Sequence, residues 1–116
     1  MTKGQLNIAS GECLIETVYR ADGALERMRG LLGRERLAPD QGFWIAPCNS
    51  VHTFFMTYSL DILFLNKEGI LLKIVSELSP WRMTGMISAW ATVEMAAGQA
   101  RKLGLSVGDK LVWRAC

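Results

Sequence analysis

The chain has 116 residues, of which 50% are hydrophobic and 21% are charged. This composition is typical of a globular protein, and the length fits a single domain, residues 1–116, with one core. The formal net charge of +2 is too small to indicate a nucleic-acid partner or an anionic membrane surface. No segment approaches the ~20 apolar residues of a transmembrane helix, and the first residues lack the apolar region of a signal peptide. We therefore expect a cytoplasmic protein with no nucleic-acid partner and no membrane attachment.

The cysteines agree with that location. Cys13, Cys48 and Cys116 are odd in number and far apart, with no paired spacing. A disulfide framework is therefore not expected, as is usual in a reducing compartment.

The first half of the chain predicts strands around one short helix. Leu6 to Arg20 has the residue types of one or two strands, with a turn or bulge near Ser10-Gly11. Asp22 suits the N-cap of an amphipathic helix over residues 23–32, where apolar side chains recur at helical spacing. Phe43 to Ile45 is then a short buried strand.

The second half predicts a hairpin and further strands. The runs 60–65 and 70–75 are β-rich, and the four-residue loop 66–69 joins them. Because both runs are apolar on nearly every residue, we expect them to be central and covered on both faces. Residues 83–89 resemble a loop, 90–95 a strand, 98–103 a helical turn and 110–114 a last strand. The fold class expected is α+β, mostly β, with a single barrel-like antiparallel or mixed sheet and one or two short helices.

The segment from Pro47 to Leu65 concentrates reactive residue types. It holds Cys48, Asp61 and the one histidine of the chain, His52. These three are the candidate catalytic residues, because an imidazole can activate a thiol. On a helix the Cα atoms of Cys48 and His52 would lie ~6 Å apart, but on a strand ~13 Å apart, too far for a hydrogen bond. The alternative is a buried cysteine and a histidine bonded within the sheet.

Asp61 enters an apolar strand, so its carboxylate needs a partner or its pKa rises. Structurally, it would cap the Tyr58-Ser59 turn or pair with an arginine such as Arg29 or Arg82. Functionally, it would be an acid or base in a cleft. The dispersed cysteines and single histidine offer no metal-ligand spacing, so we expect no metal and no cofactor.

Trp81 and Arg82 place an aromatic ring beside a guanidinium. This pair suits a sugar ring, an aromatic ligand or a carboxylate, and with Arg29 it forms the candidate ligand-binding set. The alternative is a tryptophan that packs the open end of a barrel. Glu94 lies between two apolar strand residues, and we expect it to face solvent.

Three functions remain open. The first is a small-ligand-binding module with a polar cleft for a small polar ligand. The second is a hydrolase or transferase that uses Cys48 or His52. The third is a protein-interaction module that docks through Met83 to Trp90, a segment rich in methionine and apolar for a loop. The sequence leaves the oligomeric state open.

Several short motifs together resemble domain-of-unknown-function family 192. They are the runs 29–32, 52–65, 66–69, 80–82 and 104–111. Many relatives have a tryptophan–methionine–lysine–asparagine run before a proline–leucine–aspartate, where this chain has Phe55 to Tyr58 and then Ser59 to Asp61. The resemblance implies a small mixed α+β domain on a barrel-like sheet, in its short cytoplasmic form. It implies no established activity.

Overall fold

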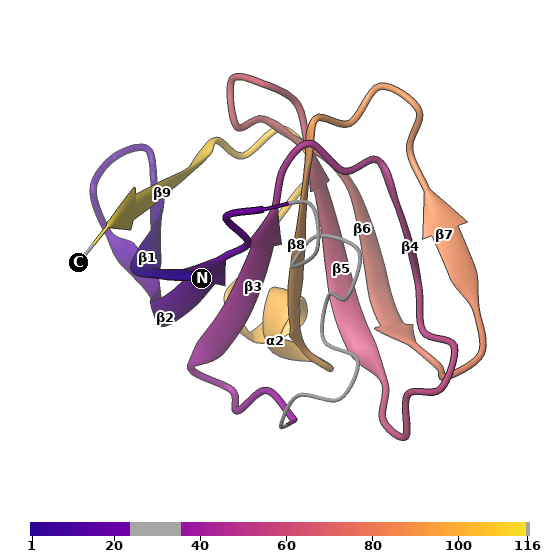
Figure 1. The fold of residues 1–116 in the computed structure, drawn as a ribbon. Coiled ribbons are helices and arrows are strands. Elements are labelled where there is room, and N and C mark those ends of the chain that lie inside the picture. Colours follow the sequence, from indigo (N-terminus) through magenta and orange to yellow (C-terminus); the bar gives the residue numbers. More distant parts are fainter. Residues whose placement is uncertain (24–35, 116) are drawn as a thin grey trace.

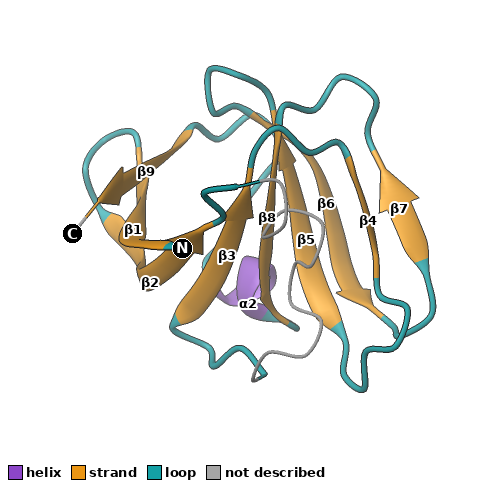
Figure 2. Ribbon diagram, viewed as in Figure 1, coloured by secondary structure: helices purple, strands orange, loops and turns teal. Residues whose placement is uncertain are grey.

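The computed structural model describes residues 1–23 and 36–115 (Figure 1). The elements in chain order are β1 (Thr2–Ile8), β2 (Cys13–Arg20), β3 (Gln41–Ile45), β4 (Ser50–His52), β5 (Leu60–Leu65), β6 (Leu71–Leu78), β7 (Met83–Gly85), β8 (Ala91–Ala96), α2 (Gln99–Lys102) and β9 (Leu111–Ala115). Strand predominates and helix is scarce in this part of the chain, so the α+β, mostly β prediction is confirmed (Figure 2). The helix expected over residues 23–32, including Arg29, falls almost wholly outside the described residues.

The main sheet has the strand order β6-β5-β8-β3-β2-β1-β9. All its neighbours are antiparallel except β2 and β3, which run parallel. The sheet stays open. Its edge strands β6 and β9 meet only where they begin, through an isolated bridge between Ile70 and Lys110. Gly69 precedes this bridge with φ 83°, and a side chain there would collide with the Leu111 carbonyl.

The predicted hairpin is present, but its two strands differ in burial. Every residue of β5 is buried, because β5 lies between β6 and β8 and both of its faces are covered. β6 is an edge strand, and several of its side chains are half-buried or exposed. The expectation of a central strand is therefore confirmed for β5 and wrong for β6.

β4 and β7 form a separate two-stranded ribbon, which stands beside β5 and β6 in Figure 1. Val51 pairs with Thr84, and His52 pairs with Met83. The expectation of a loop over residues 83–89 is thus wrong for β7. Each of these strands has three residues and a partner more than 30 positions away, so local periodicity could not reveal the pairing. Lys73 on β6 ties the ribbon to the main sheet, because its Nζ donates to the Gly85 carbonyl at 3.0 Å.

The two faces of the main sheet carry two hydrophobic clusters. One cluster includes Leu63, Val93 and Ala100, so α2 covers that face. The other includes Phe43, Ile62 and Phe64, and the half-buried side chains of Val51 and Met86 pack on it from the ribbon and its loop. Alternate residues of β5 and β8 belong to opposite faces, as the pleat of a strand requires.

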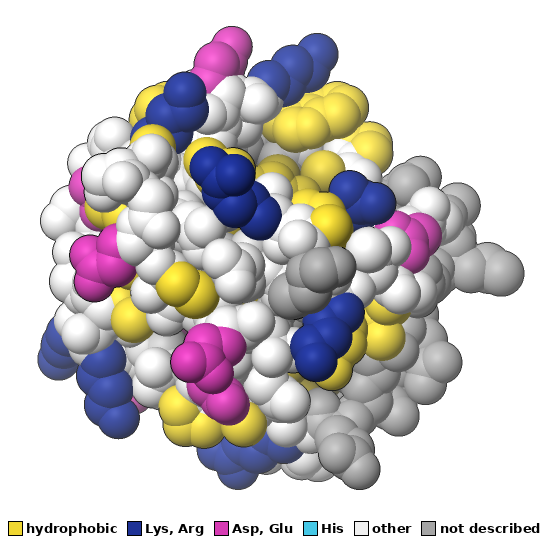
Figure 3. All heavy atoms as spheres, turned by 90° about the vertical axis from the view of Figure 1, so that its left-hand side faces the viewer, with side chains coloured by type: hydrophobic (Ala, Val, Ile, Leu, Met, Phe, Trp, Pro, Cys, Tyr) yellow, Lys and Arg dark blue, Asp and Glu magenta, His cyan; other side chains and the backbone are white. Residues whose placement is uncertain are grey.

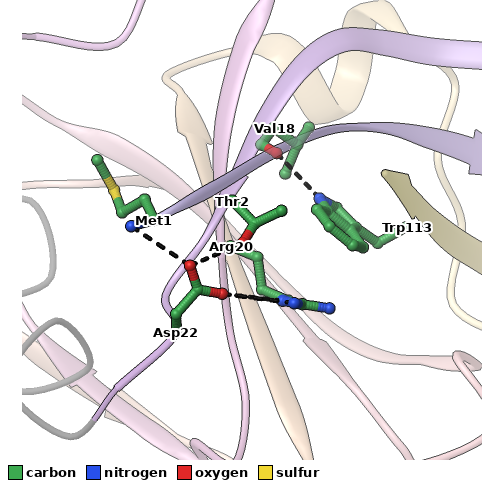
Figure 4. A network of polar contacts seen from close by, with 6 residues as sticks. All are labelled: Met1, Thr2, Val18, Arg20, Asp22 and Trp113. Atoms are coloured by element: carbon green, nitrogen blue, oxygen red, sulfur yellow. Dashed lines mark hydrogen bonds and ion pairs between the residues drawn. The ribbon is translucent and has the colours of Figure 1, made fainter. Parts of the chain in front are cut away.

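A polar network fixes the end of the sheet where β1, β2 and β9 meet (Figure 4). Asp22 accepts a hydrogen bond from the Thr2 hydroxyl at 2.7 Å and pairs with Arg20 at 3.4 Å. The Thr2 bond is the main cause that lowers the pKa of Asp22. Arg20 also lies over the Trp113 ring, whose Nε1–H donates to the Val18 carbonyl at 2.9 Å. The network joins three strands at the side of the molecule away from the ribbon (Figure 1).

The surface at that end mixes charges of both signs. Figure 3 shows Lys and Arg interspersed with Asp and Glu on this face, with no histidine among them. Among the residues that the structure describes, no helix has the length and apolar character that a membrane crossing requires.

Candidate functional site

Four rings gather where the β4–β5 loop meets the β6–β7 loop. The rings of His52 and Phe54 stack with centroids 4.8 Å apart, and Phe54 stacks on Trp81 at 5.9 Å. Phe55 approaches Trp81 from another side, with centroids 4.7 Å apart and tilted planes. We call these four residues the aromatic platform. Its outer members are exposed to solvent, Phe55 by 68% and Trp81 by 56% of their surface.

Hydrogen bonds of Thr53 fix the loops that carry the aromatic platform. Its side chain is buried, and its hydroxyl donates to the Ser79 carbonyl at 2.6 Å and accepts from the Arg82 N–H at 3.0 Å. Its backbone N–H donates to the Arg82 carbonyl at 2.8 Å, and its carbonyl accepts from the Trp81 N–H at 3.0 Å. One residue thus holds the two loops together.

The backbone of the platform is itself unusual. Phe55 has φ 66° and Trp81 has φ 62°, in the left-handed region that bulky residues rarely adopt. Such conformations persist only where surrounding contacts impose them, and they cluster at ligand clamps and active sites. Here the Thr53 bonds supply part of that constraint. The large apolar rings are therefore held outward instead of folding into the core.

Arg82 and Met83 extend this surface. The Arg82 side chain is exposed, and its Nη1 donates to the Trp81 carbonyl at 3.3 Å, which keeps the guanidinium beside the platform. Met83, paired with His52 across the ribbon, is 69% exposed. The structure therefore brings together three of the predicted site residues, His52, Trp81 and Arg82.

Cys48 and His52 are not joined. The half-buried Cys48 thiol donates to the Ser50 carbonyl at 3.2 Å and packs against the cluster around Phe43 and Ile62. His52 is exposed on β4, and its Nδ1 accepts a hydrogen bond from the Phe54 N–H at 3.3 Å. Each side chain has its own local partner, as the extended geometry of β4 predicts.

Asp61 lies fully buried on β5, away from solvent. Its Oδ1 accepts from the N–H groups of Glu77 at 2.8 Å and Gly98 at 3.0 Å, and its Oδ2 accepts from Ala100 N–H at 2.9 Å. The partner is thus neither the Tyr58-Ser59 turn nor Arg82. Backbone donors from β6 and from the start of α2 satisfy the carboxylate, so Asp61 anchors two elements to β5 and does not line the aromatic platform.

Glu94 is a second buried carboxyl, and the expectation that it faces solvent is wrong. It is only 6% exposed, because β8 is an interior strand and the face that carries Glu94 is covered. Its cross-strand neighbours are Phe43 on β3 and Ile62 on β5. Burial raises the pKa of Glu94 to about 7. The sequence signal was a glutamate inside an apolar strand, but alternation alone could not say that both faces are covered.

The charge of Glu94 affects the pKa of Tyr58. Burial raises the pKa of Tyr58, the Glu94 carboxylate raises it further, and Arg36 opposes both. The Arg36 guanidinium lies over the Tyr58 ring, 5.2 Å from its centroid. The Tyr58 hydroxyl is buried, and it has no hydrogen-bond partner among the residues that the structure describes. Sequence reasoning did not select this tyrosine, and nothing local in the sequence marks it.

The methionine-rich segment divides between core and surface. Met86 packs on the cluster around Ile62 and Phe64, whereas Ile87 is almost fully exposed and Trp90 is partly exposed. The Lys67 ammonium lies over the Trp90 ring at 4.8 Å.

Within residues 1–23 and 36–115, no three His, Cys, Asp or Glu side chains gather as a metal site would need. Arg29 lies outside the described residues.

The comparisons identify the family. Residues 6–113 match DUF192, described as "Uncharacterized ACR". This chain belongs to that family. A UPF0127 protein of Pyrococcus furiosus is 32% identical over 117 residues, covering 93% of this chain and 96% of that protein. A UPF0127 protein of Pyrococcus abyssi is 34% identical over 65 residues, which span only 55% of each chain. The resemblance inferred from the short motifs is therefore confirmed.

Two solved structures share the fold of this chain. A candidate transcription regulator from Sinorhizobium meliloti superposes with a TM-score of 0.81 and 26% identity, covering 97% of this chain and 92% of that one. A protein of unknown function from Novosphingobium aromaticivorans gives a TM-score of 0.76 and 22% identity, covering 96% and 84%. The family is uncharacterised, and these likenesses establish the fold without assigning an activity.

Proposed function

We propose that this DUF192 protein is a small-ligand-binding module whose contact surface is the aromatic platform with Arg82. The ligand class is a small molecule that carries a flat ring face and a carboxylate. The observation that carries the proposal is the stack of His52, Phe54 and Trp81, held outward by Thr53. The surface is a platform and not the concave polar cleft expected from the sequence.

The ring preference follows from the exposed side chains. Phe55 and Trp81 leave large apolar surface in water, and a sugar or aromatic ring that covers them removes that surface from water. Because the platform is already fixed by backbone bonds, binding costs little further ordering of these side chains. Pre-organisation therefore favours a compact, rigid ligand.

The carboxylate preference follows from Arg82. Its guanidinium offers planar N–H donors beside Trp81, and that fork matches a carboxylate in a bidentate geometry. His52 at the other end of the stack adds a polar edge. A ligand whose ring lies on Trp81 can thus direct its acid group toward Arg82.

The hydrolase or transferase alternative has less support. A nucleophilic thiol needs a base within hydrogen-bond reach, but the bonds of Cys48 and His52 go to Ser50 and Phe54.

The free thiols of Cys13 and Cys48 fit the reducing cytoplasm, which we propose as the location. We also predict that the protein has no nucleic-acid partner.

The test is an NMR titration of ¹⁵N-labelled protein with matched probes. The acids are D-galacturonate and benzoate, and their uncharged counterparts are D-galactose and benzamide. We expect an acid probe to shift the Trp81 indole and the Phe54 and Phe55 amides more than its uncharged counterpart does. Trp81→Ala should abolish the shifts, and Arg82→Gln should remove the preference for the acid.

Trp90→Ala is the matched control, because Trp90 is also an exposed tryptophan but is not part of the platform. It should leave the titration unchanged. The proposal fails if none of the four probes shifts the platform at millimolar concentration. It also fails if Trp81→Ala binds an acid probe as tightly as the parent protein does.

A further inference from the structure

We infer that His52 is a positioning residue whose neutral imidazole assembles the aromatic platform, and that protonation of this ring takes the platform apart. The juxtaposition is an imidazole at the end of β4 and the backbone N–H of Phe54 two residues later, joined at 3.3 Å. This regulation acts on the site of the proposed function, and its consequence for ligand binding rests on that function.

The bond between His52 and Phe54 fixes the protonation state of the ring. Its acceptor is Nδ1, and a ring nitrogen accepts a hydrogen bond only through a lone pair that carries no proton. The bond therefore assigns the neutral tautomer with its proton on Nε2. An imidazolium would instead point a second N–H group at the N–H of Phe54, so protonation breaks this bond.

The same bond has the form of an Asx turn. In such a turn a side-chain oxygen accepts from the backbone N–H two residues later. Asn66 does this in the hairpin loop, where its Oδ1 accepts from the Glu68 N–H at 3.0 Å. Nδ1 of His52 takes the place of that oxygen, with one difference. The asparagine oxygen keeps its lone pairs near neutral pH, whereas an imidazole can gain a proton there.

The turn that follows His52 depends on outside support. The Thr53 carbonyl accepts from the Met56 N–H at 3.1 Å, which closes a β-turn with Phe54 and Phe55 at its two central positions. Phe55 stands third, with φ 66°, where a turn usually has glycine. Because this conformation is costly for phenylalanine, contacts from outside the turn must hold it. The bond from the Phe54 N–H to His52 is such a contact, at the second position of the turn.

The bond also sets the order of the rings. Phe54 lies between His52 and Trp81, at centroid distances of 4.8 Å and 5.9 Å. Since the Phe54 N–H is tied to the His52 ring, rotation of the Phe54 backbone separates the two stacked rings. Loss of the bond therefore lets Phe54 leave the stack and removes the support of Trp81 on that side.

The charged groups around His52 leave the imidazole as the switch. In the ribbon and the two loops that carry the platform, the other titratable side chains are Tyr58 and Arg82. Tyr58 packs into the core, and Arg82 stays charged. On β6, beside the ribbon, the Lys73 ammonium is bonded to a ribbon carbonyl and Glu77 is exposed. Histidine is the residue type among these whose charge changes near neutral pH.

The test compares two matched variants in the free protein. His52→Asn keeps an acceptor at the position of Nδ1 but cannot gain a proton, and His52→Phe keeps a ring but removes the acceptor. The readout is hydrogen exchange of the Phe54 amide by NMR from about pH 8 to about pH 5. The ¹⁵N resonances of the His52 ring report its tautomer and its protonation in the same samples.

We expect the proton of neutral His52 on Nε2. As His52 protonates, the protection of the Phe54 amide in the parent protein should fall about fivefold relative to His52→Asn, the loss expected for one hydrogen bond. His52→Phe should show the low protection at every pH.

Benzamide separates this inference from the proposed function, because an uncharged probe does not respond to the charge that His52 gains. Its affinity should fall about fivefold as His52 protonates and should stay constant in His52→Asn. If benzamide and the acid probes bind neither protein at any pH, the proposed function fails, and hydrogen exchange at Phe54 alone decides the role of His52.

Three results would overturn the inference. The ring resonances of neutral His52 could place the proton on Nδ1, which would exclude the bond to Phe54. The Phe54 amide could be equally protected in the protonated parent protein and in His52→Asn, which would mean that the imidazolium holds the stack through its charge. His52→Phe could match His52→Asn, which would reduce the role of His52 to ring packing.

Discussion

Thr53 and Arg82 are joined by a reciprocal pair of hydrogen bonds: the Thr53 N–H donates to the Arg82 carbonyl at 2.8 Å, and the Arg82 N–H donates to the Thr53 hydroxyl at 3.0 Å. The pair links the residue after β4 to the residue before β7. It therefore closes the ribbon at the end that carries the aromatic platform, and it sets the positions of Phe54 and Trp81.

Thr53→Val should destabilise the protein by about 2 kcal/mol, because it removes two part-buried hydrogen bonds of the Thr53 hydroxyl, one to the Ser79 carbonyl and one from the Arg82 N–H. The variant should also weaken binding of any platform ligand, since the two loops lose their common anchor. Urea denaturation measures the first effect. Thr57→Val, at an exposed threonine of the same loop, is the control and should change stability by less than about 0.5 kcal/mol.

Asp61→Asn should destabilise the protein by about 3 kcal/mol. The amide has one acceptor oxygen in place of two, and its NH₂ would face a backbone N–H that now lacks a partner. Hydrogen exchange should show the largest loss of protection at Gly98 and Ala100, where α2 begins. Asp40→Asn, an exposed aspartate, is the control. Full stability of the Asp61 variant would contradict the anchoring role.

Glu94 should make stability fall as pH rises through a defined window. Burial raises its folded-state pKa from 4.5 to about 7, so the folded protein holds this proton more tightly than the unfolded chain does. The stability that it contributes is complete below about pH 4.5 and is lost as pH approaches about 7. As pH rises between these limits, the free energy of unfolding of Glu94→Gln should therefore increase relative to that of the parent protein by about 3 kcal/mol.

Urea denaturation of both proteins at pH 4.5, 6 and 8 measures that difference. Glu16→Gln, at an exposed position of β2, is the matched control and should track the parent protein across the series. A Glu94→Gln difference that does not vary with pH would show that Glu94 ionises in the folded protein as it does in the unfolded chain.

Alkylation should separate the thiols by exposure. Cys13 is exposed on β2, whereas Cys48 is half-buried and its thiol is bonded to the Ser50 carbonyl. With Cys116 replaced by serine, iodoacetamide near neutral pH should modify Cys13 well before Cys48, as peptide mapping by mass spectrometry would show. Faster modification of Cys48 would revive the hypothesis of a cysteine nucleophile.

Local sequence patterns predicted the elements that have strong local signals. The alternating and apolar runs predicted β2, β5, β8 and the end of β1 from Leu6 onward, and the loop at residues 66–69 predicted the hairpin. Of the two geometries considered for Cys48 and His52, the extended one excluded a direct bond, and the structure, in which each has another partner, agrees with it. By contrast, β7 was predicted as a loop, because a three-residue strand is stabilised by its partner and not by its own sequence.

The sequence by itself determined the family and the mostly β fold class, because motifs and periodicity are local properties. Whether Trp81 is exposed beside Arg82 or packed in the core was decided by the tertiary structure. Only the tertiary structure decided which polar residues are buried and what they meet. Asp61 and Glu94 are both carboxyls in apolar strands, yet one receives three backbone N–H bonds and the other receives none from the described residues. That difference depends on which segments lie above each strand, and those segments come from distant parts of the chain.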